Sequence, residues 1–387
     1  MKEIKNSDLK TELSNVGFDK SYLHKAVEKY QYKNIKFFDL TLPQSNILKQ
    51  TAISVGADCA IHREVLTAKV EKTDCILGGS ISQLKKITEK LRRQPFKLAK
   101  LADLIEENID FRLQPVQIKE TTFDFTKPYI VGVLNLTTNS FSDGGEFFEF
   151  DKACLQLLKL IEDGADIIEL GAESTKPSSS PVSADIQLEK LLPMLDFIKE
   201  KNIITPISID TRSAEVAEAC INAGADIIND VSGLEYDEKM VKVAAKSNVK
   251  VIIQHSKGEP KTMQNAPEYE NLMDEIFLSL RKKIEFAIEM GVKKENIIID
   301  AGIGFGKTRE HNFEIIRRIE ELFSLKCPIM LGVSRKRLLG MPEETNEIKD
   351  VFTLALNAIV ITNNVNFIRV HNVALHRMLI DSFFLSD

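Results

Sequence analysis

The feature that most constrains the fold is a repeat of short apolar runs, each followed by a polar loop and a helical segment, along the last two thirds of the chain. Eight of these runs have the length and β-branched composition of buried strands. They are Ile130–Leu136, Ile167–Leu170, Ile207–Asp210, Ile227–Asn229, Lys250–Ile253, Ile297–Asp300, Ile329–Leu331 and Phe367–Val370. The helical segments between them include Asp151–Asp163, Asp185–Lys201, Ser213–Ala223 and Tyr269–Met290. This alternation predicts an α/β protein with a (β/α)₈ TIM barrel. A doubly wound open sheet is the weaker alternative, because no GxGxxG turn is present.

Smaller signals support the same arrangement. Two helical segments end in one shared phrase, Gly-Ala-Asp-Ile-Ile, at residues 164–168 and 224–228. Glycine is common just past a helix C-terminus, and the remainder of the phrase leads into the next strand. Before the first strand, residues 120–127 alternate apolar and polar side chains. We expect them to form a short hairpin that closes the bottom of the barrel.

Residues 1–115 are expected to form a small α/β domain of their own, followed by the barrel domain at 116–387. Helical spacing is present at the start, residues 34–42 and 59–70 resemble strands, and Leu84–Glu107 has a helical pattern interrupted at Pro95. The Gly78–Ser80 turn is interpreted as a helix cap rather than a phosphate site. No role is predicted for this domain.

Composition excludes several classes of protein. No run approaches the ~20 apolar residues that a membrane span needs, and the start of the chain has no apolar secretion signal. The five cysteines are scattered without a CxxC pair, which argues against a disulfide framework or a structural zinc site. We therefore expect a cytoplasmic protein with reduced thiols.

Charge is unevenly distributed. Residues 1–115 carry 20 Lys and Arg against 15 Asp and Glu, whereas the whole chain has a net charge of −6. The basic excess is concentrated in residues 85–100, which lack interleaved aromatic residues. We interpret it as a solvated helix face and expect no nucleic-acid binding.

Polar side chains follow every predicted strand. Near these strand ends lie Asn135, the GAESTKP segment at 171–177, Asp210, Asn229, His255, Asp300, Lys336, Arg369 and His371. Taken singly, each has a structural explanation, such as a helix cap or a turn. The carboxyl ends of barrel strands meet at one edge, however, so polar residues at eight successive ends predict an active site.

The residue types indicate the chemistry of the ligand. Asp210, Asn229 and Asp300 can pair with the donor and acceptor edge of a guanidine-like heterocycle such as a pterin. Ser334, Lys336, Arg369 and His371 are suited to phosphate oxygens. Asn135 beside a diphosphate suggests a Mg²⁺ site with few protein ligands. The segment AGIGFGKT at 301–308 lacks the spacing of a P-loop, so an NTPase is rejected.

Seven segments of the barrel, in order, resemble the signature segments of dihydropteroate synthases, the folate-pathway enzymes inhibited by sulfonamides. They are VGVLNLTTNSFSDGG, IIELGAESTKP, ISIDTR, IINDVSG, IIIDAGIGFGKTREHN, LGVSRKR and IRVHNV. The resemblance covers nearly the whole barrel and leaves out residues 1–115.

The resemblance implies a transferase that condenses 6-hydroxymethyl-7,8-dihydropterin pyrophosphate with p-aminobenzoate to give 7,8-dihydropteroate and diphosphate, with Mg²⁺ as cofactor. It assigns the pterin to Asp210, Asn229, Asp300 and Lys336. It assigns the diphosphate to Asn135, Thr175, Arg369 and His371, with Asn135 also as the metal ligand. The p-aminobenzoate pocket is assigned to Phe141, Pro177, Lys336 and Arg337, and the catalytic role to Asp143, Asp300 and Lys336. A homodimer is frequent in the family, and the sequence leaves it open.

The sequence departs from the family pattern mainly in the p-aminobenzoate half of the site. Departures occur at Thr138, Asn139, Glu169, Lys176, Gln254, Ser256, Lys257, Arg337 and Asn372. Two other functions stay open at this point. One is a pterin-binding barrel that transfers a methyl group from methyltetrahydrofolate, and the other is a non-catalytic family member that acts as a partner. The residues suited to diphosphate argue against the first, and the presence of Asp210 and Lys336 argues against the second.

Overall fold

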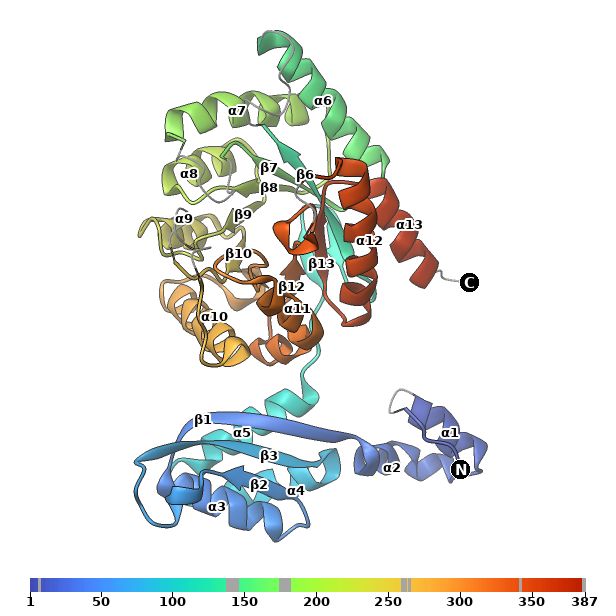
Figure 1. Cartoon of the computed structure of the whole chain (residues 1–387), viewed down its shortest axis with the longest axis vertical. Coiled ribbons are helices and arrows are strands. Elements are labelled where there is room, and N and C mark those ends of the chain that lie inside the picture. Colours follow the sequence, from blue (N-terminus) through green and yellow to red (C-terminus); the bar gives the residue numbers. More distant parts are fainter. Residues whose placement is uncertain are drawn as a thin grey trace. The chain divides into compact units, whose positions relative to one another are not determined.

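The computed structural model describes residues 1–5, 8–136, 146–173, 182–258, 263, 266–340 and 343–384. Its contacts divide the chain into two compact units, Met1–Arg112 and Leu113–Asp387 (Figure 1). The division falls just before the domain boundary expected from the sequence.

The second unit is a closed barrel of eight parallel strands surrounded by helices, in the order expected of a (β/α)₈ fold (Figure 1). All eight strands predicted from the sequence are present, with ends that differ by at most one residue. They are β6 (Tyr129–Asn135), β7 (Ile167–Gly171), β8 (Ile207–Asp210), β9 (Ile227–Asp230), β10 (Lys250–Gln254), β11 (Ile297–Asp300), β12 (Ile329–Leu331) and β13 (Phe367–Val370). The TIM-barrel prediction is therefore confirmed.

Helices connect successive strands on the outside of the barrel. They are α6 (Glu146–Glu162), α7 (Ala184–Glu200), α8 (Ala214–Asn222), α9 (Met240–Ser247), α10 (Leu272–Glu289), α11 (Arg309–Arg318), α12 (Asn346–Thr362) and α13 (Val373–Phe383). The four helices named from the sequence are confirmed as α6, α7, α8 and α10.

The continuous apolar runs are explained by burial on both faces of each strand. In β11, Ile297 and Ile299 belong to the layer between strands and helices, whereas Ile298 belongs to the barrel interior. Neighbouring β10 alternates in the same way. Each fully buried isoleucine contributes roughly 1.5–3 kcal/mol by removal of apolar surface from water, so the two apolar layers hold the strand ends in fixed positions.

A hairpin closes the bottom of the barrel, as predicted, but it spans residues 116–123 and not the expected 120–127. Strands β4 (Val116–Ile118) and β5 (Thr121–Phe123) pair antiparallel. Phe123 is fully buried and lies edge-on to Tyr129, with ring centroids 4.7 Å apart. It also packs on Phe367, so the hairpin joins the apolar cluster formed by the first residues of the strands.

The repeated Gly-Ala-Asp-Ile-Ile phrase has a function beyond ending a helix. Asp166 accepts a hydrogen bond from the backbone N–H of Ile130 at 2.7 Å, and Asp226 accepts one from Ile207 at 2.8 Å. Each aspartate thus ties the start of an adjacent strand to the loop before its own strand. The sequence analysis explained the glycine and missed the aspartate.

The first unit is built around a three-stranded antiparallel sheet in the order β1-β3-β2. Its elements are α1 (Leu9–Asn15), α2 (Leu23–Tyr30), β1 (Tyr32–Thr41), α3 (Leu42–Ile53), β2 (Asp58–Ile61), β3 (Lys72–Ser80), α4 (Ile81–Leu91) and α5 (Leu98–Asp110). Residues from α3, α4, α5 and the sheet form its core. The helix break at Pro95 is confirmed.

Two expectations for this unit were inaccurate. The strand expected over residues 59–70 ends at Ile61, and the central strand β3 was not recognised because its last residues read as a turn. Those residues remain in the strand until Ser80, whose side chain caps α4 in a capping box with Gln83. The predicted helix cap is therefore confirmed.

Two global observations complete the fold. Within the described residues, no helix is both long enough and apolar enough to cross a membrane. All five cysteines are buried and unbridged, as expected from their scattered positions.

Candidate active site

Asp210, Asn229 and Asp300 lie at the carboxyl ends of neighbouring strands of the barrel. Asp210 pairs in register with Asn229, and Asp300 pairs with Gln254 at the end of β10. The strand order β8-β9-β10-β11 places their side chains along one side of the barrel mouth. The structure thus brings together the three residues that the sequence assigned to a heterocycle.

A buried network connects these residues across the barrel. The Asn229 side-chain amide donates to Glu169 Oε2 at 3.0 Å. Arg369 lies 3.5 Å from Glu169 Oε1 and 3.6 Å from Asp300 Oδ2. Glu169, Asn229 and Asp300 are each at most 2% exposed, and Arg369 is 8% exposed. A single guanidinium therefore balances two buried carboxylates.

This network leaves several polar atoms unsatisfied. Among the described residues, Asp210 Oδ1, Asn229 Oδ1, Gln254 Oε1 and Asp300 Oδ2 are buried acceptors without a hydrogen-bond partner. The terminal nitrogen of Arg369 that faces Glu169 makes the 3.5 Å ion pair but no hydrogen bond. Leaving a buried polar group unpaired costs about 1–3 kcal/mol. Such a concentration at one barrel edge is expected where a ligand supplies the missing donors and acceptors.

Burial changes the ionisation of the two carboxyl groups beside Asn229. Burial, assisted by the nearby Glu169 and opposed by Arg369, raises the pKa of Asp210 to about 8. Burial also raises the pKa of Glu169, and Arg369 offsets this only in part. Burial works against the charge of Arg369, but Glu169, Asp300 and Asp210 outweigh it and raise the pKa of the guanidinium. These groups thus form one electrostatically connected unit.

Lys336 extends into the same site from the loop after β12. Its amine donates to the carbonyl of Ile303 at 2.6 Å and lies 4.9 Å from the centre of the Phe305 ring. Burial, assisted by Arg369, lowers the pKa of Lys336 to about 7, against the opposing influence of Asp300, Glu169 and Asp210. The amine is therefore poised to change charge near neutral pH.

The residues assigned to the diphosphate lie at the ends of β6 and β13. His371 Nδ1 is 2.8 Å from the Ser334 hydroxyl, which also accepts the His371 backbone N–H at 3.3 Å. Arg369 belongs to β13, and Asn135 ends β6 with an exposed side chain. The neighbouring Arg335 is instead engaged by Asp350 at 2.7 Å, which makes it a structural residue.

The assigned metal ligand can be tested against this arrangement. No group of three or more His, Cys, Asp or Glu residues suited to a metal ion is present in the described residues. Asn135 offers one neutral oxygen at the mouth of the barrel. This fits Mg²⁺ only where substrate phosphates and water supply the other ligands, which is the usual manner of binding for this ion.

Several assigned residues fall outside the described part of the chain. They are Phe141, Asp143, Thr175 and Pro177, together with the departures at Thr138, Asn139 and Lys176. For Arg337 only the backbone is described, as the first residue of a short 3₁₀ turn. Their assigned roles remain predictions.

Other residues of the site were not identified as such from the sequence. Glu169 was noted only as a departure, yet it forms the centre of the buried network. Phe305 and Lys307 lie in the AGIGFGKT segment, for which a P-loop was rejected and whose resemblance to a family signature assigned no role to either residue. Lys307 is 2% exposed and contacts His255 on the adjacent loop. An apolar ring and a lysine inside a polar, glycine-rich loop were the available signal.

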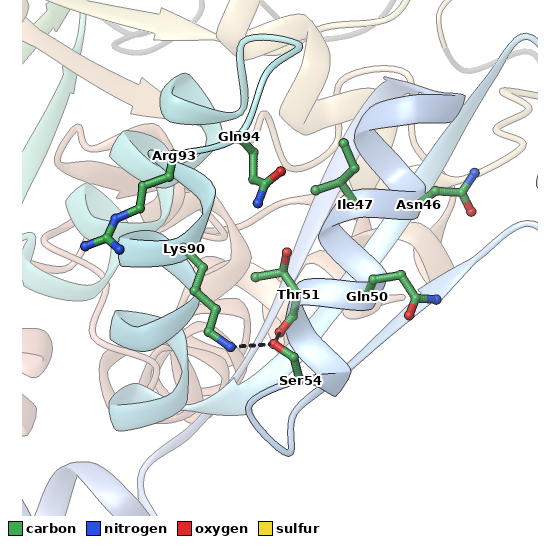
Figure 2. A pocket seen from close by; sticks show the side chains of 8 residues that line it. All are labelled: Asn46, Ile47, Gln50, Thr51, Ser54, Lys90, Arg93 and Gln94. Carbon is green, nitrogen blue, oxygen red and sulfur yellow. Dashed lines mark hydrogen bonds between the residues drawn. The ribbon is translucent and has the colours of Figure 1, made fainter.

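Two hollows lie outside this network. One, of about 370 Å³, is beside the mouth of the barrel and is lined by Glu173 and Arg212, which form an ion pair at 2.8 Å, and by Tyr236, whose ring is 4.2 Å from the guanidinium. The other, of about 550 Å³, lies in the first unit between α3 and α4 (Figure 2). In it Lys90 donates to Ser54 at 2.7 Å. Its lining contains no carboxylate, thiol or histidine.

The fold and the buried site define a class of protein, a TIM-barrel enzyme that binds a polar heterocycle at the carboxyl ends of its strands. A family model described as "Pterin binding enzyme" matches residues 131–371. A dihydropteroate synthase of Clostridium beijerinckii is 42% identical over 251 residues, which cover 64% of this chain and 90% of that protein. The chain therefore belongs to the pterin-binding enzymes and, within them, to the dihydropteroate synthases. Its activity is that of a dihydropteroate synthase, a transferase of the folate pathway.

Two further comparisons extend this result. The crystal structure of dihydropteroate synthase from Clostridium difficile in the presence of pteroic acid superposes with a TM-score of 0.63 at 37% identity, covering 67% of this chain and 98% of that one. A probable bifunctional folylpolyglutamate synthase/dihydropteroate synthase of Haloferax volcanii is 33% identical over 344 residues, 85% of this chain and 40% of its own length. Because the barrel unit makes up less than three quarters of the chain, this match necessarily extends into residues 1–112.

Proposed function

We propose that the residues at the carboxyl edge of the barrel carry out the condensation of 6-hydroxymethyl-7,8-dihydropterin pyrophosphate with p-aminobenzoate in the roles given below. The observation that carries the proposal is the group of buried, unpaired acceptor atoms at the ends of β8 to β11. A dihydropterin has an amino group and ring N–H groups along one edge, and these donors would satisfy the acceptors.

The pterin would lie across the mouth of the barrel with its polar edge on Asp210, Asn229 and Asp300. A carboxylate suits two adjacent N–H donors, and an amide matches one donor and one acceptor. Lys336 would donate to a ring acceptor, because its amine is already directed into the site by the Ile303 carbonyl. The fixed strand ends provide the rigidity that such recognition needs.

The leaving diphosphate would be held by Asn135, Arg369 and His371, with Thr175 assigned to the same group. Arginine binds phosphate oxygens in a fork, and the Ser334 contact fixes the orientation of the His371 ring. Mg²⁺, when bound through Asn135 and the substrate phosphates, would neutralise charge that develops on the leaving group. The terminal nitrogen of Arg369 that faces Glu169 makes only a 3.5 Å ion pair there, so a phosphate oxygen would supply its missing hydrogen bond.

The substitution itself needs little from a general base. When the bond between the pterin methylene and the diphosphate oxygen breaks, positive charge develops on the methylene, and Asp300 and the predicted Asp143 are suited to stabilise it. The arylamine nitrogen then forms the new bond and loses a proton. Phe141, Pro177, Lys336 and Arg337 are assigned to hold the p-aminobenzoate, and exclusion of water would protect the cation.

A homodimer is a separate proposal about the barrel unit. Helix α12 exposes Ile348, Val351, Phe352 and Ile359. Their spacing places all four on one face of the helix, and an exposed apolar face of this kind is typical of a protein interface. We expect Val351→Glu to convert the dimer to a monomer in analytical ultracentrifugation. A wild-type chain that sediments as a monomer at micromolar concentration would rule the proposal out.

The test of the proposed roles is diphosphate release by the full chain with dihydropterin pyrophosphate and Mg²⁺, with and without p-aminobenzoate. We expect release that depends on p-aminobenzoate and yields dihydropteroate. Lys336→Ala should abolish it while the circular dichroism spectrum stays unchanged. Arg335→Lys serves as the matched control, because Arg335 engages Asp350 and not the site, and should keep most of the activity. Full activity of Lys336→Ala with unchanged Michaelis constants would contradict the assignment.

A further inference from the structure

Lys307 is a buried lysine that the reaction described above does not use. It is 2% exposed and is the last residue of the 301–307 loop, which follows β11. Its amine is 2.9 Å from His255 Nδ1, 3.0 Å from the carbonyl of Phe305 and 3.4 Å from the carbonyl of His255. The amine can donate to all three of these atoms, and burial lowers its pKa well below the ordinary lysine value. The amine therefore joins the loop after β10 to the loop after β11.

The two loops that Lys307 joins are in close contact along their backbones. A Cβ on Gly302 would lie 1.9 Å from the carbonyl oxygen of His255, and one on Gly306 would lie 2.1 Å from that of Lys257. Both glycines have positive φ, at 69° and 64°. Only residues without a side chain allow this approach. The loop at 301–307 can therefore pack against the loop after β10 in only one way.

That position matters because the same loop holds Lys336. The loop provides the Ile303 carbonyl that accepts from the Lys336 amine at 2.6 Å, and the Phe305 ring 4.9 Å from it. Phe305 is also the residue whose carbonyl accepts from Lys307. A displacement of the loop would therefore move both groups that direct the Lys336 amine into the barrel.

We propose that Lys307 is a positioning residue for pterin binding, which acts by fixing the 301–307 loop so that Ile303 and Phe305 hold Lys336 over the barrel mouth. This inference rests on the proposed role of Lys336. Lys307 itself makes no hydrogen bond or ion pair with Asp210, Asn229, Asp300 or Lys336. Charged groups around it are Asp300, Lys336, Lys283 and Lys257, and its ring partner is neutral, because burial lowers the pKa of His255 to about 2.

A second buried lysine provides a matched control. Lys283 is 6% exposed, and its amine donates to the carbonyls of Ser232 at 3.0 Å and Gln254 at 3.3 Å. It therefore joins the loop after β9 to the last residue of β10, and it also forms an ion pair with Glu235 at 3.0 Å. It has no recorded contact with Ile303 or Phe305. A purely structural role predicts the same result for both lysines, whereas positioning predicts a difference.

The experiment compares Lys307→Met and Lys283→Met in the full chain. Calorimetric titration with 6-hydroxymethylpterin measures ligand affinity, and diphosphate release across pH measures activity. We expect both variants to melt at lower temperature than wild type. Only Lys307→Met should weaken pterin binding, by about tenfold or more, as for loss of one charge-assisted hydrogen bond. As pH rises, its activity should also be lost at a lower pH than the activity of wild type, because loss of the Ile303 acceptor lowers the pKa of Lys336.

Should Lys307→Met fail to fold, Asn312→Ala tests the same loop from its other side. Asn312 accepts the Gly304 N–H at 2.8 Å, and its removal should likewise weaken pterin binding and shift the pH profile. Pterin affinity within twofold of wild type in these variants, or an equal loss in Lys283→Met, would overturn the inference. Failure of the wild-type chain to release diphosphate in response to p-aminobenzoate would instead refute the proposed function.

Discussion

Replacing Asp210 by asparagine should make the ligand-free barrel more stable while removing pterin binding. The pKa of Asp210 is raised from 3.8 to about 8, so the folded chain must take up a proton that the unfolded chain has already lost at neutral pH. Between these two pKa values, stability falls by about 1.4 kcal/mol for each rise of one pH unit. Asparagine is neutral in both states and avoids this loss.

The magnitude follows from the difference between the two states. At pH 7 a fully buried carboxyl with this shift would cost about 4 kcal/mol. Asp210 is only half-buried as a residue, and solvent screening reduces the value, so we expect a gain of about 2 kcal/mol. The gain should be small near pH 5 and largest near pH 8, because the cost grows as pH rises toward the folded-state pKa.

Urea unfolding of the full chain, followed by far-ultraviolet circular dichroism at pH 5 and pH 8, measures this difference. The chain has no tryptophan, so fluorescence is less suitable. Asp166→Asn is the control, because a change in its urea midpoint identifies which unfolding transition belongs to the barrel. It removes the negative charge that pairs with Arg377 at 2.7 Å, at the opposite end of the barrel from Asp210, and should destabilise the barrel at both pH values. An Asp210→Asn variant that is less stable than wild type at pH 8, or a difference that does not widen with pH, would refute the reasoning.

Three further outcomes are expected. Pterin affinity of the wild type should fall as pH rises through about 7, where Lys336 loses its charge, and Lys336→Met should lack this dependence in calorimetric titrations. Chelation of Mg²⁺ should stop diphosphate release, and Asn135→Ala should raise the Mg²⁺ concentration needed for half-maximal rate; an unchanged requirement would remove Asn135 as a ligand. Gly302→Ala should lower the free energy of unfolding by about 2 kcal/mol or more, because the new methyl meets the His255 carbonyl at positive φ, and equal stability in urea would contradict the described loop contact.

The sequence predicted the barrel well because its signals are local. Runs such as Ile297–Asp300 combine β-branched composition with a polar end, and both properties can be read without knowing the neighbours. The first unit was less predictable. Strand β3 was missed because Gly78 and Gly79 suggest a turn, whereas tertiary pairing with β1 keeps them extended.

Prediction of the candidate site from the sequence is limited in the same way, because only local signals can be read. The positions of Asp210, Asn229 and Asp300 followed from strand order alone. The bond between Asn229 and Glu169, and the bridge from Lys307 to His255, join residues 60 and 52 positions apart. No local pattern encodes such contacts, because they depend on how adjacent loops pack. These two pairs can be predicted only from the three-dimensional arrangement of the folded barrel.

The hairpin at the bottom of the barrel has a consequence for how this enzyme acquires additional domains. Because β4 and β5 cover the amino ends of the strands, the polypeptide enters the barrel on the side away from the reacting groups. The hairpin therefore separates the point where the chain enters the barrel from the residues at the carboxyl ends of the strands. The occurrence of such a barrel both as a single enzyme and within a larger bifunctional chain is the pattern that this separation permits.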